Sequence, residues 1–130
     1  MAESNISKEV LEFISEHIIS LEQLEMLLLL SSQPAKEWTL DSVFTEIQSS
    51  QASIAHRLQE FCDKGLLVKK QNGLFQYAPR NESVAHAIHA LSVAYKERRM
   101  KVIELIYRKP VDEVQSFADA FKIRKDKPNA

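Results

Sequence analysis

Apolar residues recur at spacings of three and four over residues 6–30, which is the period of an α-helix. The series is Ile6, Val10, Phe13, Ile14, Ile18, Leu21, Leu24 and Leu28. Ser20, with Gln23 three residues later, is typical of a helix N-cap, so we expect this stretch to form two helices. Pro34, in the polar stretch 31–37, then ends the helical pattern.

Residues 38–64 predict a short strand and then two helices joined by a brief turn. Trp38 to Leu40 favour a strand, and Thr39 or Asp41 is suited to cap the next helix. We expect the inward face of that helix to consist of Val43, Phe44 and Ile47. Ser50 ends a polar turn and can cap the second helix, whose apolar stripe is Ile54, Leu58 and Phe61. Ala52, Ser53, His56 and Glu60 are expected to project the other way.

The only two glycines of the chain follow this second helix. Gly65 is placed to end the helix in a positive-φ conformation, and Asn72-Gly73 predicts a two-residue hairpin turn between strands at 66–70 and 74–78. The order of helix, turn, helix and hairpin is therefore predicted for residues 38–80.

A third segment follows Pro79. Asn81 or Ser83 can cap a helix that the apolar spacing extends to about Arg108, a length of about 38 Å. Because one small domain cannot cover such a rod on every side, we expect part of it to meet a second copy of the chain. The residues predicted for that dimer interface are Val84, Ile88, Leu91, Tyr95, Val102 and Ile106. Val114, Phe117, Ala118 and Phe121 outline a last short helix.

Charge and composition limit the function classes. The chain has 130 residues and a net charge of −1, but residues 1–48 carry −7 while 49–80 and 81–130 carry +3 each. There is no glycine-rich phosphate loop, no metal-ligand spacing and no nucleophile in a known context, so we expect no enzyme and no cofactor. The uncharged stretches are too short to cross a bilayer, and no secretion signal is present, which favours a cytoplasmic protein.

The stretch from Trp38 to Pro79 resembles a winged helix-turn-helix domain, and the layout of the chain is similar to bacterial transcriptional regulators of the MarR and PadR sort. The resemblance rests on Trp38-Thr39-Leu40, on the faces Phe44 with Ile47 and Ile54 with Leu58 and Phe61, on Lys64-Gly65-Leu66-Leu67 and on Tyr77-Ala78-Pro79. It implies that the helix after the turn enters the major groove, that the wing touches the DNA backbone or the minor groove, and that terminal helices form a two-fold dimer. The wing departs from the MarR pattern, which is longer and carries a characteristic Asp and Arg.

The expected fold is therefore a single, mainly α domain with a small β-hairpin. It comprises an N-terminal helical segment at 1–37, the winged helix-turn-helix at 38–80, and long packing and dimerisation helices at 81–130. The leading hypothesis is a homodimeric regulator of transcription that binds double-stranded DNA. Its DNA-binding residues are predicted to be Ser50, Gln51, Ala52, Ser53, His56 and Arg57 on the second helix, and Lys69, Lys70, Gln71 and Asn72 on the wing.

Alternatives stay open from the sequence. Glu60 and Asp63 on the second helix, which is predicted to contact DNA, would repel phosphate. The same scaffold could therefore dock a protein, with the acidic N-terminal helix as the contact. Arg98, Arg99 and Lys101 either pair with Glu9, Glu12 and Glu16 of that helix or form an exposed basic surface. His86 and His89 lie one turn apart but lack further ligands for a metal, and Cys62 is interpreted as a small buried residue.

Overall fold

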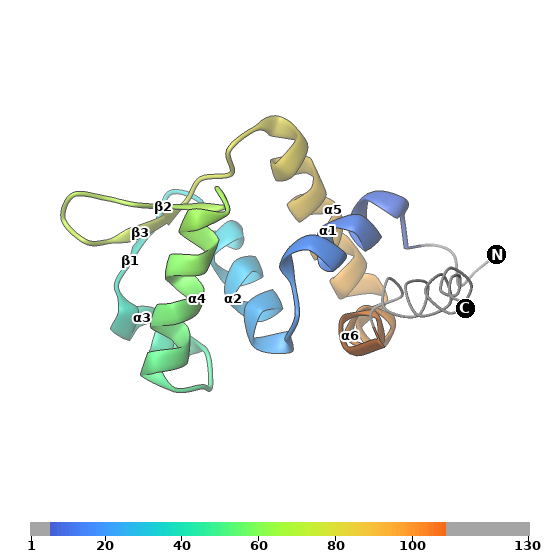
Figure 1. Ribbon diagram of the computed structural model, residues 1–130, viewed down its shortest axis with the longest axis horizontal. Coiled ribbons are helices and arrows are strands. Elements are labelled where there is room, and N and C mark those ends of the chain that lie inside the picture. The colour runs from blue at the N-terminus through green and yellow to red at the C-terminus, as the bar shows by residue number, and fades with distance from the viewer. Residues whose placement is uncertain (1–5, 109–130) are drawn as a thin grey trace, which may run out of the picture.

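We describe the protein from a computed structural model, in which residues 6–108 are placed. Six helices and three short strands make up this part of the chain (Figure 1). The helices are α1 (Lys8–His17), α2 (Leu21–Ser32), α3 (Leu40–Glu46), α4 (Gln51–Asp63), α5 (Glu82–Glu97) and α6 (Arg99–Arg108). The strands are β1 (Glu37–Trp38), β2 (Leu67–Lys69) and β3 (Phe75–Tyr77). The predicted last helix at residues 114–121 lies outside the described residues.

Side-chain caps explain where the helices begin. A hydroxyl or amide oxygen at each N-cap accepts a hydrogen bond from the backbone N–H three residues later, which satisfies a donor that the helix itself leaves free. The capping residues are Ser7, Ser20, Thr39, Ser50 and Asn81. The predicted division of the N-terminal stretch at Ser20 is thus confirmed, and so are the caps at Thr39, Ser50 and Asn81.

The three strands form an antiparallel sheet in the order β1-β3-β2. Trp38 pairs with Phe75, and Val68 pairs with Gln76. The hairpin is confirmed, but its turn differs from the prediction. The Lys70 N–H bonds the Leu74 carbonyl at 2.7 Å and the Gly73 N–H bonds the Lys70 carbonyl at 2.8 Å, so the loop has three residues, with Gly73 at φ 86°. A turn followed by one left-handed residue is the usual way to close a loop of this length.

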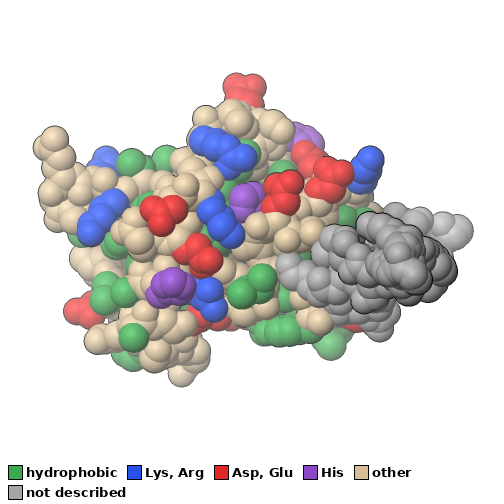
Figure 2. Space-filling model, in the orientation of Figure 1, with side chains coloured by type: hydrophobic (Ala, Val, Ile, Leu, Met, Phe, Trp, Pro, Cys, Tyr) green, Lys and Arg blue, Asp and Glu red, His purple; other side chains and the backbone are tan. Residues whose placement is uncertain are grey.

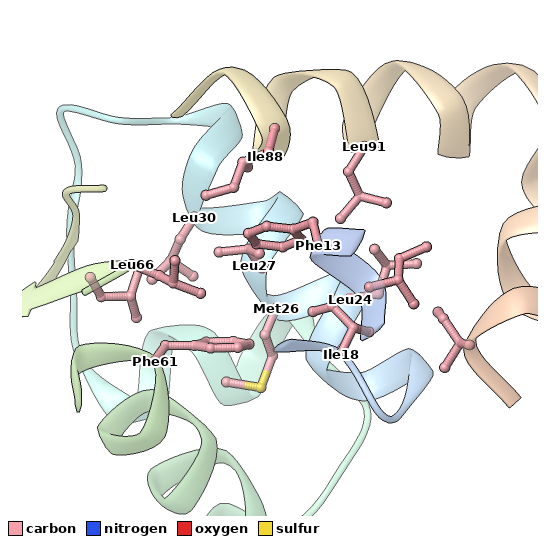
Figure 3. Close-up of a cluster of buried hydrophobic side chains, with 14 of the residues drawn as sticks. Phe13, Ile18, Leu24, Met26, Leu27, Leu30, Phe61, Leu66, Ile88 and Leu91 are labelled. Carbon is pink, nitrogen blue, oxygen red and sulfur yellow. The ribbon is translucent and has the colours of Figure 1, made fainter. Parts of the chain in front are cut away.

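Helix α2 lies at the centre of the molecule. In Figure 1 it runs between α4 and the sheet on one side and α1, α5 and α6 on the other. Its buried side chains reach in both directions: Met26 approaches Phe61 of α4, while Leu24 lies toward α1 and α5 (Figure 3). One core therefore joins the helix-turn-helix segment to the flanking helices, as a single domain requires. In the described part of the chain, every helix is too short or too polar to cross a membrane.

The single long helix predicted for residues 81–108 is wrong. At Arg98 the backbone leaves the helical region, with φ −137° and ψ 56°, and α6 starts in a new direction. The bend lets Val102 and Ile106 reach the core, where α6 packs against α1 as well as α5. The signal was present in the sequence, because Arg98 and Arg99 interrupt the apolar spacing.

The side chains predicted for a dimer interface lie mostly inside the single chain. Val84, Ile88, Leu91, Val102 and Ile106 are all buried, and Tyr95 is half-buried. Apolar spacing marked these positions correctly as one face, but the bend at α6 supplies that face with a partner from the same chain.

Candidate functional site

Helix α4 exposes a row of side chains that contains no carboxylate, lysine or arginine. Ser50 caps the helix, and the exposed residues that follow are Gln51, Ala52, Ala55, His56 and Gln59, which we call the α4 face. Ile54, Leu58 and Phe61 fill the core on the opposite side, as predicted. The α4 face is confirmed as exposed at Gln51, Ala52 and His56, and the structure adds Ala55 and Gln59.

Two of the predicted reading residues point elsewhere. Ser53 donates hydrogen bonds to both carboxylate oxygens of Glu22 on α2, at 2.9 and 2.7 Å. Arg57 donates from Nε to Glu22 at 3.2 Å, and Ser49 also donates to this carboxylate. Both charged side chains are largely buried, with 19% of Arg57 and 18% of Glu22 exposed. The prediction that Ser53 and Arg57 lie open for a ligand is therefore wrong.

Further polar contacts extend this arrangement along α4. Arg57 donates from Nη1 to Glu60 at 3.2 Å, and Gln23 of α2 donates to the same oxygen of Glu60 at 3.0 Å. Gln23 is buried and accepts from the backbone N–H of Ile19 at 2.6 Å. We call Glu22, Gln23, Ser49, Ser53, Arg57 and Glu60 the Glu22 network.

The electrostatics of the network favour its charged form. Burial alone would raise the pKa of Glu22, but hydrogen bonds from Ser49, Ser53 and Arg57 outweigh it, so the pKa lies below its usual value. Burial likewise opposes the charge of Arg57, yet bonds to Glu22 and Glu60 raise its pKa. Two helices are thus joined by a charged, hydrogen-bonded cluster beside the apolar core, which fixes the direction in which the α4 face points.

The hairpin places its polar residues beside β1. Lys70 lies 2.9 Å from the Glu37 carboxylate, and Lys69 lies over the ring of Phe75 at 5.6 Å from its centre. Asn72 accepts a hydrogen bond from the Leu74 N–H at 3.0 Å, which supports the turn. Lys69, Lys70 and Gln71 are exposed, as predicted. Two cations near the hairpin tip are therefore accessible to a ligand on that side.

Charges of both signs surround the α4 face. On the side shown in Figure 2, basic, acidic and histidine side chains alternate over α4, and no continuous basic strip joins it to the hairpin. Gln51 donates to Asp41 at 3.2 Å and Gln59 donates to Asp63 at 3.0 Å. These side-chain bonds are exposed, so a ligand that offers the same hydrogen bonds can replace them.

Phe44 also differs from its predicted place. It was expected in the core with Val43 and Ile47, which are indeed buried, but 38% of Phe44 is exposed. Helix α3 has only seven residues, and the inward positions are filled by Val43 in the helix and by Ile47 at its C-cap. Phe44 therefore leaves an aromatic ring at the surface of the helix that precedes the α4 face.

Most of the remaining candidate side chains lie in pairs. Glu9 contacts His86 at 2.8 Å, Glu12 contacts Lys8 at 3.9 Å, and Glu16 contacts His17 at 3.6 Å. Of the two alternatives for Arg98, Arg99 and Lys101, ion pairs to these acids are not found within residues 6–108; Lys101 pairs with Glu104, and Arg99 lies over the Tyr95 ring. Cys62 is half-buried. Within residues 6–108 no three side chains of the metal-binding types come together.

Comparison with known proteins places no further constraint on this site. No protein-family model, no curated protein and no solved structure matches the chain.

Proposed function

We propose that the chain is a winged helix-turn-helix protein that binds double-stranded DNA. In this proposal α3 and α4 are the two helices of the motif, α4 enters the major groove, and the β2–β3 hairpin is the wing. The observation that carries the proposal is the α4 face: its side chains are two glutamines, two alanines and a histidine, they follow a capped helix start, and none of the described elements packs over them.

The chemistry of the α4 face suits base edges. A glutamine side chain can pair with adenine through two hydrogen bonds, and a histidine can bond bases or phosphates. Ala52 and Ala55 lie between Gln51 and His56 and leave room for the helix to approach the floor of the groove. Contact with the base edges is therefore assigned to Gln51, His56 and Gln59. Ser53 and Arg57 are assigned the role of orienting α4 through the Glu22 network.

Phosphate attraction is assigned to the hairpin side. Lys69 and Lys70 are exposed there, and Lys36 lies over the Trp38 ring at the start of the same sheet. The ion pair between Lys70 and Glu37 is at the surface, where such pairs contribute little, so phosphate can compete for this lysine. Few cations are available, and we expect modest affinity for each subunit.

A homodimer stays part of the proposal, as a regulator that reads two half-sites would need one. Five of the six residues predicted for its contacts are buried within the single chain, so the proposal moves the contact to another surface. The outward side of α6 offers Met100 and Tyr107 instead, which are 72% and 61% exposed. Sedimentation equilibrium of the full chain measures the oligomeric state directly.

Selection of bound sequences from a random duplex pool tests DNA binding. The selected duplex is then titrated at low salt with three double variants. Lys69→Gln/Lys70→Gln is expected to weaken binding to all duplexes alike, whereas Gln51→Ala/His56→Ala is expected to remove the preference for the selected one, at about 1–3 kcal/mol per lost base contact. Lys8→Gln/Lys101→Gln removes the same charge far from α4 and serves as the control.

Two results would contradict the proposal. One is a pool from which no sequence is enriched. The other is equal loss of affinity in the hairpin variant and in the control, because the hairpin would then contribute only net charge.

A second candidate function is the docking of another protein on α3 and α4. It is favoured by the exposed Phe44 and by the engagement of Arg57 with two carboxylates. Removal of the N-terminal helix cannot test an acidic contact there, because Val10, Phe13 and Ile14 belong to the core. Two variants distinguish the possible docking surfaces and leave the core intact. Glu12→Gln/Glu16→Gln changes the acidic side of α1, and Phe44→Glu changes the surface of α3.

A further inference from the structure

A groove of about 760 Å³ lies on the side of the molecule formed by α2, β3 and α5. Its volume falls in the range of small-molecule sites. The lining side chains of α5 recur every three to four residues from Ile88 to Lys96, so they form one stripe; Leu28 of α2, Tyr77 of β3 and Arg99, the first residue of α6, complete the lining. The site does not include the α4 face or the Glu22 network.

The floor of the groove is apolar. Ile88 is buried, Leu28 is half-buried, and Val93 at the rim is 39% exposed. Burial raises the pKa of both phenols, Tyr77 and Tyr95, so they stay neutral near pH 7. An alkyl chain or ring could cover this floor and remove apolar surface from water.

The two ends of the groove differ in charge. At one end are Lys96 and Arg99, and the guanidinium of Arg99 lies over the Tyr95 ring at 4.9 Å from its centre. Glu25 accepts a long hydrogen bond of 3.5 Å from the Tyr95 hydroxyl, which leaves an excess of one positive charge here. No carboxylate lines the groove within the described residues.

The opposite end is the C-terminus of α2. Its last carbonyls carry partial negative charge, and the hydroxyls of Ser31 and Ser32 donate to the carbonyls of their own helix at 3.1 and 2.7 Å. The α2 carbonyls disfavour an anionic group, whereas Lys96 and Arg99 favour one beside them; His89 is the third basic side chain of the lining. The groove thus distinguishes the two ends of an elongated ligand.

We propose that this groove binds a single-chain amphipathic carboxylate, with the carboxylate at Lys96 and Arg99 and the apolar chain along Leu28, Ile88 and Val93. A cationic amphiphile would place its charge beside two like charges. A neutral one would leave the cations unused. This inference does not depend on DNA binding.

Calorimetric titration of the full chain with octanoate, 1-octanol and octylammonium tests the charge preference. Octanoate is expected to saturate one site per chain and to bind at least about tenfold more tightly than the other two, since a charge-assisted hydrogen bond contributes more than a neutral one. Amide chemical shifts are expected to change along residues 88–99 and near Tyr77. Octanol that binds as tightly as octanoate, or the absence of saturable binding, would overturn the proposal.

Variants locate the carboxylate. Lys96→Gln/Arg99→Gln is expected to weaken octanoate binding about tenfold or more while leaving octanol unchanged, whereas Lys8→Gln/Lys101→Gln, with equal loss of charge outside the groove, is expected to bind octanoate like the wild type. Circular dichroism checks that each variant is folded. Equal octanoate affinity in the groove variant and the control would overturn the assignment.

Discussion

Glu22 is the residue through which α2 and α4 are joined by charged contacts. Replacing it with glutamine removes the charge that Ser49, Ser53 and Arg57 surround, and leaves Arg57 with Glu60 alone. We expect Glu22→Gln to lower the free energy of unfolding by about 1–3 kcal/mol. Urea denaturation at pH 7 measures this change. Glu12→Gln on exposed α1, 62% open to solvent, is the matched control and is expected to change stability by less than about 0.5 kcal/mol.

The same residue makes stability depend on pH in one direction. The pKa of Glu22 in the folded chain lies below 4.5, its ordinary value, so the folded state holds the charged form more strongly than the unfolded state does. Its contribution is therefore fully present above pH 4.5 and is lost as the pH falls through the folded value. Stability of the wild type should fall more steeply than that of Glu22→Gln below pH 4.5. Parallel curves for the two proteins would contradict this account.

At the residue scale, the sequence predicted correctly those features whose physical cause lies within a few neighbouring residues. The caps at Ser20 and Ser50 and the positive φ of Gly65 and Gly73 depend on neighbours within a few residues. The Glu22 network joins positions more than thirty residues apart, and no local pattern pairs Glu22 with Arg57. A partial signal existed, because Ser53, Arg57 and Glu60 form a polar row next to the apolar stripe of α4.

The two glycines are expected to differ in their tolerance of a side chain. A Cβ at Gly73 would meet nothing within 4 Å, so Gly73→Ala adds only the strain of positive φ, about 1 kcal/mol. A Cβ at Gly65 would lie 2.9 Å from Cδ of Arg80, whose Nη1 donates to the Lys64 carbonyl at 2.7 Å. We therefore expect Gly65→Ala to destabilise by about 2 kcal/mol in thermal or urea unfolding. Equal effects would show that Arg80 moves away freely.

At the scale of elements, α6 packs its apolar side against the core of its own chain and exposes the other side to solvent. Val102 is fully buried, whereas Met100 two residues earlier is exposed. Val102→Asp places a carboxylate in the core and is expected to destabilise by more than about 3 kcal/mol, while Met100→Asp is expected to have little effect on folding. Urea unfolding gives both values. A stably folded Val102→Asp chain with a lower molar mass by sedimentation would instead indicate that Val102 lies between subunits.

Elements were predictable in type and order, but less so in direction. Periodicity located the helices, but the bend at Arg98 was marked only by Arg98 and Arg99 interrupting the apolar spacing, and that interruption does not give the direction in which α6 continues. Around the short helix α3, Val43, Phe44 and Ile47 were all predicted to face inward, but only Val43 and Ile47 are buried. The hairpin was foreseen from Asn72-Gly73, but the number of residues in its turn depends on which strand hydrogen bonds close it.

At the scale of the whole molecule, the uneven distribution of charge along the chain does not produce a one-sided surface. Residues 49–80 carry a net charge of +3, yet Arg57 is enclosed by Glu22 and Glu60, and Lys70 contacts Glu37. Folding therefore brings acids from the N-terminal third against bases from the middle. Net charge by segment showed that the two parts differ in sign, but it could not predict that they would pair with each other or how little positive charge would remain for a ligand.

This neutralisation sets how the proposed DNA binding should respond to salt. Each phosphate contact contributes about −0.9 to the slope of log K against log salt, so contacts from Lys36, Lys69 and Lys70 alone predict a slope of about −3 per subunit. Lys69→Gln/Lys70→Gln should reduce its magnitude by about two, whereas Arg57→Gln should leave it unchanged, because Arg57 orients α4 without touching phosphate. The measurement is duplex affinity between low and moderate salt for folded variants. A slope reduced by about one in Arg57→Gln would mean that phosphate displaces Glu22 and Glu60, and that the Glu22 network opens when DNA binds.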